Sequence, residues 1–404
     1  MSDTFKAETP EQILDVIQWA VDAEKSLDVR ALATKRDYGR PPGADINVLD
    51  ISGISGIDLY EPGELVMSAA AATPMSEILV ALAEHNQRLP FEPPNLGPLL
   101  GSGSEAGSIG GVFACNLAGP RRVSAGSARD HILGFHAISG RGEMFKSGGR
   151  VVKNVTGFDL SKLMAGSFGT LGVMSDVTFK VLPEPEKSRT VLVMTKDNAS
   201  GVAAMTSALH SSCEVSGAAH LPADIASRSG VSYVAGAQGA VSAIRVEGPG
   251  PSVDSRTNTL RQLLAEFGET EELHTTNSRS LWREVCDVDY FVAGTDQIWR
   301  LSVAPADGVK VAQKIMDSIG GRAFFDWGGG LVWLAIDARP DGAHQDVRDA
   351  LAGFGGHATL LRAAADVRSQ VPVFQPQPDV LAQVSARVKK SFDPKGVLCP
   401  GRMV

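Results

Sequence analysis

A glycine-rich segment holds the residues whose types and spacing could bind a phosphate. Residues 101–122 read GSGSEAGSIGGVFACNLAGPRR, which joins small residues to the pair Gly110-Gly111, to Asn116 and to Arg121-Arg122. Consecutive backbone N–H groups in such turns bind anions, and glycine lets the backbone approach a phosphate closely because it has no Cβ. The segment matches neither the Rossmann nor the P-loop pattern. From these residues alone, phosphate binding and a purely structural loop both remain open.

Two further segments could take part in the same chemistry. Residues 148–159 read GGRVVKNVTGFD and lead to GSFGTLG at 166–172, a pattern that also fits two hairpins around a short helix. Lys153 beside Asn154 could equally belong to a solvated cluster. The C-terminal FDPKGVLCPGR at 392–402 stops a helix and turns the chain back, and alone it is only a C-terminal stop signal.

The composition argues against several classes of function. Glycine accounts for 43 of 404 residues, about 11% against a usual ~7%, and such an excess needs a structural or binding reason. Lysine and arginine number 38 against 46 acidic residues, a net charge of −8 without a basic run, which argues against nucleic-acid and polybasic membrane binding. The four cysteines are far apart and form no C-x-x-C. We therefore expect no disulfide framework, no metal site and a cytoplasmic location.

The first half of the chain must position the glycine-rich turns. Thr9 predicts a helix start, with Pro10 at the first helical position and Gln12 completing a capping box. The apolar pattern predicts a second helix at 74–85. It also predicts strands, at 29–33, 46–51, 64–70, 132–139 and 173–181.

The second half alternates strands and helices in a different way. Strand-like runs lie at 190–194, 240–246, 298–303 and 331–336, and helical patterns lie at 201–210, 254–267, 308–319, 343–351 and 378–392. This alternation predicts an α+β domain with a mainly antiparallel sheet and is compatible with two similar halves, although no sequence repeat is visible. Pro183-Glu184-Pro185 separates the two patterns. We therefore expect one domain at 1–185 and another at 186–404.

Taken together, these segments resemble the FAD-binding domain of the vanillyl-alcohol-oxidase (PCMH-type) flavoproteins. The resemblance is carried by NLAGPRR at 116–122, GSARD at 126–130, KNVTGFD at 153–159 and GTLGV at 169–173. More narrowly, the chain resembles the FAD-binding subunit of bacterial glycolate oxidase nearly from end to end. The further matching motifs are VEG (246–248), WRLSV (299–303), DW (326–327), GGHATLLR (355–362), FDPKG (392–396) and PGRM (400–403).

The resemblance implies a fold and a set of cofactor contacts. A PCMH-type two-subdomain FAD-binding domain would be followed by the α+β domain, with the tail (392–404) returning to the cofactor domain. The turn Ala31–Lys35 would cradle the pyrophosphate first and residues 106–111 second. A third turn, with Gly169, Gly172 and Val173, would flank the adenine and the pyrophosphate, while Asn116 and Gly126 would lie near the flavin. The implied cofactor residues are Ala33, Thr34, Lys35, Ala106, Gly107, Ser108, Ile109, Gly110, Gly111, Asn116, Gly126, Gly169, Gly172 and Val173.

The chain departs from the family pattern in two places. Ala31-Leu32-Ala33 stands where small residues or glycines usually precede Thr-Lys, and Leu32 cannot adopt a positive φ cheaply. Cys399 stands where an asparagine usually precedes Pro-Gly-Arg. Neither His131 nor His136 matches a covalent flavin anchor, so FAD is expected to bind non-covalently.

The resemblance also implies a reaction. Glycolate, a 2-hydroxy acid, would be oxidised to glyoxylate, with hydride passing to the flavin while a base takes the hydroxyl proton. Such a site needs a cation for the substrate carboxylate. The candidate cations are Arg121, Arg122, Arg300 and Arg362, and His357 is a candidate base; none is assigned as catalytic.

The metal-binding histidines and the Gly-Glu-His-Gly signature of the related catalytic subunit are absent from the sequence. The resemblance therefore implies an accessory, electron-transferring flavoprotein in a complex with a catalytic flavin subunit and an iron–sulfur subunit. Electrons would pass towards membrane quinone, and the chain would meet the inner face of the membrane only through these partners. Two alternatives are a self-sufficient FAD-dependent dehydrogenase of a D-lactate-like acid and a structural subunit with a decayed flavin site.

Overall fold

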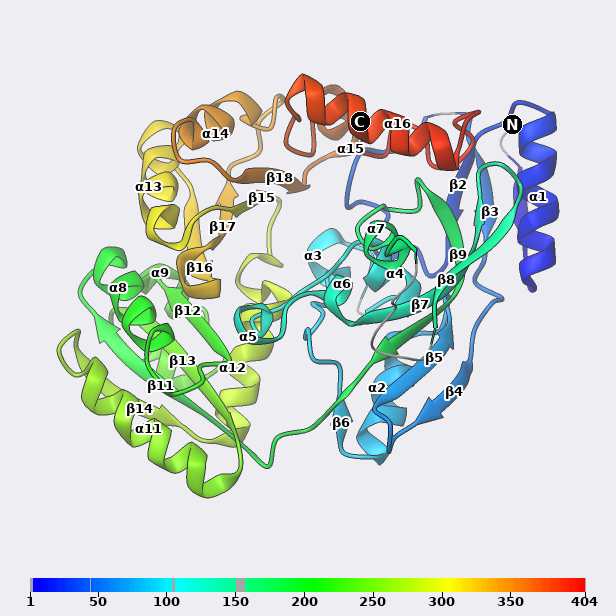
Figure 1. Ribbon diagram of the computed structural model, residues 1–404. Helices are drawn as coiled ribbons and strands as arrows, with labels where there is room; N and C mark the ends of the chain where they lie inside the picture. Colours follow the sequence, from blue (N-terminus) through cyan, green and yellow to red (C-terminus); the bar gives the residue numbers. More distant parts are fainter. Residues whose placement is uncertain (1–2, 44, 104–105, 150–156, 404) are drawn as a thin grey trace. The chain divides into compact units, whose positions relative to one another are not determined.

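The computed structural model describes residues 3–43, 45–103, 106–149 and 157–403 (Figure 1). The predicted cluster around Lys153 and Asn154 lies outside the described residues. The chain divides into two compact units, which we call the first and the second unit. The first unit comprises residues 1–117, 127–184 and 376–404, and the second comprises residues 118–126 and 185–375.

A three-stranded parallel sheet opens the first unit. Its strands, in spatial order, are β1 (Thr4–Lys6), β3 (Asn47–Asp50) and β2 (Leu27–Arg30). Helix α1 (Pro10–Asp22) connects β1 to β2 and is capped by Thr9 as predicted, because the Thr9 hydroxyl accepts a hydrogen bond from the Gln12 amide. The predicted capping box is not formed, since the Gln12 side chain accepts from the Glu8 amide instead of the Thr9 amide. The helix buries Ile13 and Ile17, which lie one turn apart.

A five-stranded antiparallel sheet forms the rest of the first unit. Its strands, in spatial order, are β4 (Ile57–Glu61), β5 (Val66–Ala70), β9 (Gly172–Lys180), β7 (Ile132–Ser139) and β8 (Met144–Gly148). Phe113 packs its ring against Phe91 and Phe179 and so anchors α4 in this core. The helices and short strands around this sheet are α2 (Met75–Glu84), α3 (Gly97–Leu100), α4 (Ile109–Ala114), α6 (Ala128–His131), α7 (Leu160–Met164), β6 (Gln87–Arg88) and β10 (Leu182–Pro183).

An eight-stranded antiparallel sheet forms the second unit, as the sequence pattern predicted. It consists of two halves with the same βαββαβ order, β11-α8-β12-β13-α11-β14 and β15-α13-β16-β17-α14-β18. Counted from the outer edge of the sheet to its centre, the strands of each half lie in the order fourth, first, third, second. The halves meet at the centre, where β12 pairs with β16. The two similar halves that the pattern allowed are therefore present in the topology.

The elements of the second unit are close to the predicted runs where the apolar pattern was strong. The strands are β11 (Lys187–Thr195), β12 (Gly217–Leu221), β13 (Ala240–Gly248), β14 (Glu269–Leu273), β15 (Gln297–Ser302), β16 (Arg322–Asp326), β17 (Leu331–Ile336) and β18 (His357–Arg362). The longer helices are α8 (Asn198–Leu209), α11 (Gly250–Leu264), α12 (Thr275–Asp287), α13 (Gly308–Ile319) and α14 (His344–Leu351). The shorter helices are α5 (Arg122–Ala125), α9 (Ala223–Ala226), α10 (Ser232–Ala235) and α15 (Ala365–Gln370).

The core of the second unit lies on one face of this sheet, under α8, α11, α13 and α14 (Figure 1). On the other face α12 covers the first half of the sheet. Its Trp282 donates a hydrogen bond from Nε1 to the Thr190 hydroxyl at 2.8 Å and lies under the guanidinium of the buried Arg245. None of the described helices is long and apolar enough to cross a bilayer.

The observed division into units differs in two places from the expected single boundary at residue 185. Residues 118–126 belong to the second unit, where the Arg121 guanidinium donates two hydrogen bonds, of 2.8 and 2.9 Å, to the Glu247 carboxylate. Helix α16 (Asp379–Phe392) and the tail after it belong to the first unit, because the tail runs beside β2. The resemblance had implied the return of residues 392–404. The inclusion of α16 and the exchange of residues 118–126 were not predicted, because they depend on contacts between residues far apart in the sequence.

The buried His220 of β12 predicts an acid-sensitive second unit. Its ring bonds to the Ser242 hydroxyl and the Asn198 amide oxygen, and burial lowers its pKa from 6.5 to about 4. Between these values the unfolded chain binds a proton that the folded protein does not. The free energy of unfolding should therefore fall by about 3 kcal/mol as the pH drops from 6.5 to 4.

Urea unfolding of the second unit across this pH range measures the effect. His220→Gln should flatten the pH dependence, whereas the exposed control His210→Gln should keep it. An unchanged pH dependence in His220→Gln would show that other groups cause the acid sensitivity.

Candidate functional site

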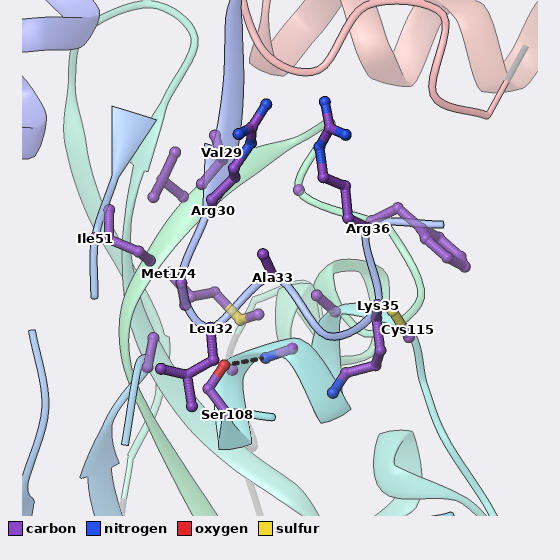
Figure 2. A pocket seen from close by; sticks show the side chains of 18 of the residues that line it. Val29, Arg30, Leu32, Ala33, Lys35, Arg36, Ile51, Ser108, Cys115 and Met174 are labelled. Atoms are coloured by element: carbon purple, nitrogen blue, oxygen red, sulfur yellow. Dashed lines mark hydrogen bonds between the residues drawn. The ribbon is translucent and has the colours of Figure 1, made fainter. Parts of the chain in front are cut away.

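A pocket opens in the first unit at the end of β2 (Figure 2). Its walls are the turn after β2, the first residues of α4 and β9, and Arg402 from the tail. The pocket joins parts of all three turns that the resemblance singled out. Nine of the fourteen predicted cofactor residues line it, namely Ala33, Thr34, Lys35, Ser108, Gly110, Gly111, Gly169, Gly172 and Val173.

The turn Ala31–Lys35 offers backbone donors to this pocket. The amides of residues 32–35 donate no hydrogen bond to any residue that the structure describes, so they are available to an anion. The strand predicted to reach Ala33 ends at Arg30 instead, because Ala33 has a φ of 55°, which an extended strand cannot accommodate. The left-handed residue is thus Ala33 and not Leu32, at a cost of about 1 kcal/mol relative to glycine.

Lys35 adds a positive charge within the same turn. The side chain is buried, and its ammonium donates hydrogen bonds to the Thr34 hydroxyl at 3.3 Å and the Ala106 carbonyl at 3.1 Å. None of the ion pairs found among the described residues involves Lys35, and burial lowers the pKa of its ammonium. A bound phosphate would supply the missing negative charge, and its approach would favour the charged form of Lys35.

The segment 106–111 contacts both the core and Lys35, and its residues Ser108, Gly110 and Gly111 line the pocket. The amides of Ile109 and Gly110 donate to the carbonyls of Thr73 and Ala71, so they are already used within the protein. A Cβ on Gly107 would lie 2.5 Å from the Lys35 ammonium nitrogen, and one on Gly111 would lie 3.1 Å from Lys35 Cε. These two glycines make room for the lysine side chain, which in turn faces the pocket.

The tail contributes Arg402 to the pocket and places Cys399 beside the third turn. One guanidinium nitrogen of Arg402 donates to the carbonyls of Lys35 and Tyr38, both at 2.9 Å. Cys399 has a φ of 43°, a left-handed conformation that asparagine adopts more readily. A Cβ on Gly169 would lie 3.7 Å from the Cys399 sulfur, so the tail packs directly against the turn that flanks the pocket.

The pocket carries an excess of positive charge that suits a diphosphate. Arg30, Lys35, Arg36 and Arg402 line it against a single carboxylate, Asp28. Asp28 lies 2.8 Å from Arg30 Nε and 3.4 Å from Arg36 Nε. Arg30 and Arg36 were not predicted as cofactor residues. Their position on either side of the turn, in RALATKR, could have indicated that they line the same site. Apolar side chains supply the remaining surface, among them Val29, Leu32, Ile51, Phe168 and Met174 (Figure 2).

Five predicted cofactor residues do not line the pocket. Ala106 and Gly107 contact Lys35 from behind, and Ile109 is buried in the core. The Asn116 side chain accepts a hydrogen bond from the Arg129 amide at 2.9 Å. Gly126 belongs to the second unit. Open amides, a buried lysine and flanking arginines nevertheless fit the diphosphate of FAD, and these residues would hold it.

The second unit brings three of the predicted substrate-site residues together around Trp327. The guanidinium carbons of Arg122 and Arg300 lie 4.8 and 5.1 Å from the Trp327 ring centre. Trp327 itself has a φ of 52° and donates its Nε1 to the Gly119 carbonyl, which fixes the indole between them. Burial and the charges of Arg300 and Arg122 lower the pKa of His357, which favours its neutral imidazole.

The other candidates are used elsewhere. Arg121 bonds to Glu247, and Arg362 donates Nε to the Asp296 carbonyl at 2.9 Å. His131 stacks on Phe91, and His136 pairs with Asp176 at 2.8 Å, so neither histidine lines the pocket. Within the described ranges, no group of three or more histidine, cysteine or acidic side chains is arranged to hold a metal.

Known proteins share both the sequence and the fold. The family described as FAD binding domain matches residues 4–148. Glycolate oxidase subunit GlcE of Escherichia coli (strain K12) is 34% identical over 392 residues, which cover 97% of this chain and 96% of that protein. Glycolate oxidase subunit GlcD of Bacillus subtilis (strain 168) is 34% identical over 93 residues, which cover 23% of this chain and 20% of that protein.

Two solved structures have the same fold at low identity. The 4-ethylphenol oxidase from Gulosibacter chungangensis gives a TM-score of 0.71 and p-cresol methylhydroxylase with substrate bound gives 0.69. Each is 13% identical, and each match covers 99% of this chain and 88% of the other. Since a relative matches at 34% identity over nearly its full length, the chain belongs to the GlcE family of glycolate oxidase subunits, FAD-linked oxidoreductases with a PCMH-type α+β fold.

Proposed function

We propose that this chain is the FAD-binding subunit of an enzyme complex that oxidises glycolate to glyoxylate and passes the electrons on through partner subunits. The observation that carries the proposal is the pocket at the end of β2, where open amides, Lys35 and three arginines converge. When bound, FAD supplies the acceptor for a hydride from the hydroxy acid. The fold alone does not imply this reaction, since related folds serve other substrates.

In this proposal the pocket holds the cofactor by its diphosphate. The amides of residues 32–35 would donate to the phosphate oxygens, and Lys35 and Arg402 would balance their charge. Apolar side chains, among them Met174, line the rest of the pocket wall. All of these contacts are non-covalent.

The cluster around Trp327 is the proposed place for the substrate carboxylate. Arg122 and Arg300 would bind the carboxylate, and the neutral His357 could accept the hydroxyl proton. Arg300 lies in register with Trp333 on β17 and Thr359 on β18, so all three lie on the sheet face away from α13 and α14. The cluster around Trp327 also favours a second candidate function, a self-sufficient 2-hydroxy-acid dehydrogenase.

The proposal includes partner subunits. The related proteins are named as glycolate oxidase subunits, GlcE and GlcD, which supports a multi-subunit enzyme. An iron–sulfur subunit as electron acceptor, quinone as the final acceptor and a cytoplasmic location with indirect membrane contact complete the proposal. Glycolate should bleach the flavin of the assembled complex. Bleaching of the isolated chain at the same rate would establish the self-sufficient enzyme instead.

Lys35→Met tests the pocket as the FAD site. Loss of the buried ammonium should weaken FAD binding by about tenfold or more, since hydrogen bonds to charged groups are worth about 1.5–3 kcal/mol. Quenching of flavin fluorescence on titration of the apoprotein measures the dissociation constant. Lys25→Met, at an exposed lysine, is the control; equal affinities for both variants would contradict the assignment.

Ala33→Gly tests the strain in the first turn. Glycine adopts the left-handed conformation freely, so the variant should gain up to about 1 kcal/mol of stability or of FAD-binding free energy. Leu32→Gly is the matched control, because Leu32 is not in that conformation and should only lose stability. If Ala33→Gly lowers both the free energy of unfolding and the FAD affinity, Ala33 is not strained in the native turn.

Arg300→Met tests the carboxylate site in the assembled complex. The methionine preserves packing against Trp327 and Trp333 but removes the charge, so KM for glycolate should rise about tenfold. FAD content should stay unchanged. Arg300→Lys should recover part of the loss, and an unchanged KM in Arg300→Met would remove this cluster from the substrate site.

A further inference from the structure

We infer that the C-terminal segment is a latch that positions two FAD-binding turns of the first unit, so that FAD binding and closure of the latch stabilise each other. We define the latch as residues Val397–Arg402 together with Lys389 at the end of α16. The inference goes beyond the proposed function and rests on it in one respect, the assignment of the FAD diphosphate to the pocket at β2.

The latch is fixed beside the strand from which the first turn emerges. The Leu27 amide donates to the Val397 carbonyl and the Cys399 amide donates to the Leu27 carbonyl, both at 2.8 Å. Leu398 thereby pairs with Leu27 as a parallel bridge. The tail thus extends the edge of the parallel sheet, and its register against β2 determines where Arg402 lies.

Arg402 then holds the second part of the first turn. Its guanidinium donates to the carbonyls of Lys35 and Tyr38, and its own carbonyl accepts from the Arg40 amide at 3.2 Å. These three contacts enclose residues 35–40 between one side chain and one backbone group. Because Arg402 also lines the pocket, the same guanidinium orders the turn and faces the bound anion.

Lys389 connects the latch to the third turn. Its ammonium donates to the Thr170 carbonyl at 2.7 Å and the Leu398 carbonyl at 3.0 Å, and it pairs with the Asp393 carboxylate. Thr170 lies between Gly169 and Gly172, which line the pocket. The buried Asp393 accepts hydrogen bonds from the amides of Val397 and Leu398, both at 2.9 Å, and so holds the start of the latch against the helix.

The coupling follows from the strain in these segments. Ala33 in the first turn and Cys399 in the latch both adopt left-handed conformations without being glycine or asparagine. Such conformations persist only where surrounding contacts impose them. Besides Arg402, the turn is held by the Ser102 hydroxyl, which donates to the Thr34 carbonyl at 2.8 Å, and by the Lys35 ammonium, which donates to the Ala106 carbonyl at 3.1 Å. The amides of residues 32–35 donate to no residue that the structure describes, so a bound ligand would add to the contacts that hold the turn. A contact that orders the latch therefore also favours the first turn in its FAD-binding conformation. By linkage, FAD binding favours the ordered latch to the same extent.

The test compares three arginine variants of the full-length chain. Arg402→Met should weaken FAD binding about tenfold or more, and Arg402→Lys, which keeps a donor and the charge, should recover part of that loss. Arg141→Met is the matched control, because Arg141 donates to the Ser391 carbonyl near the end of the same helix without contacting the pocket turns. Its FAD affinity should equal that of the wild type.

Amide hydrogen exchange gives the second readout. FAD should slow exchange at residues 397–402 of the wild type, and Arg402→Met should abolish this protection while its urea midpoint without FAD stays close to that of Arg141→Met. The latch is overturned if Arg402→Met binds FAD as tightly as the wild type, if Arg141→Met loses as much affinity as Arg402→Met, or if FAD leaves exchange in the tail unchanged. A wild-type chain that binds no FAD would instead refute the proposed function.

Discussion

The first unit depends on one constraint. The turn at the end of β2, whose amides at residues 32–35 find no partner in the described part of the chain, has to be held in a strained conformation. Buried amides without partners are costly, so a turn of this kind persists only when a ligand or its surroundings compensate. Here the surroundings come from three separate parts of the chain. Gly107 and Gly111 make room for Lys35, the tail supplies Arg402, and Gly169 packs against Cys399.

The second unit brings cationic side chains together on one face of its sheet. Two βαββαβ halves share one face for their helices and leave the other face of the second half with polar and aromatic side chains. Trp327, held in a left-handed conformation, brings Arg122 from residues 118–126 together with Arg300 from β15. The half-buried ion pair of Arg121 and Glu247 fixes that short segment to the unit. A cationic cluster therefore arises from residues 178 positions apart only because this segment folds with the second unit.

Much of this fold was predictable where the local pattern was strong. The strands Ile132–Ser139 and Leu331–Ile336 and the helix Gly308–Ile319 were predicted with their observed bounds, because their apolar residues repeat with a clear period. The first cofactor turn was recognisable from Thr34-Lys35 and its neighbours. By contrast, β18 was missed, since its GGHATLLR context reads as a turn followed by a short apolar run.

The features that could not be predicted depend on long-range contacts. Leu32, which could not adopt a positive φ cheaply, does not adopt one, and Ala33 takes the left-handed conformation instead. Gly107 and Gly111 also leave room for the Lys35 side chain, a contact that no local pattern reveals. The central claim, that the first unit binds FAD by its diphosphate at β2, is tested most directly by titrating the purified chain with FAD in the presence of ADP or AMP. The account predicts saturable FAD binding that ADP displaces far better than AMP, and it is contradicted if no FAD binds or if AMP competes as well as ADP.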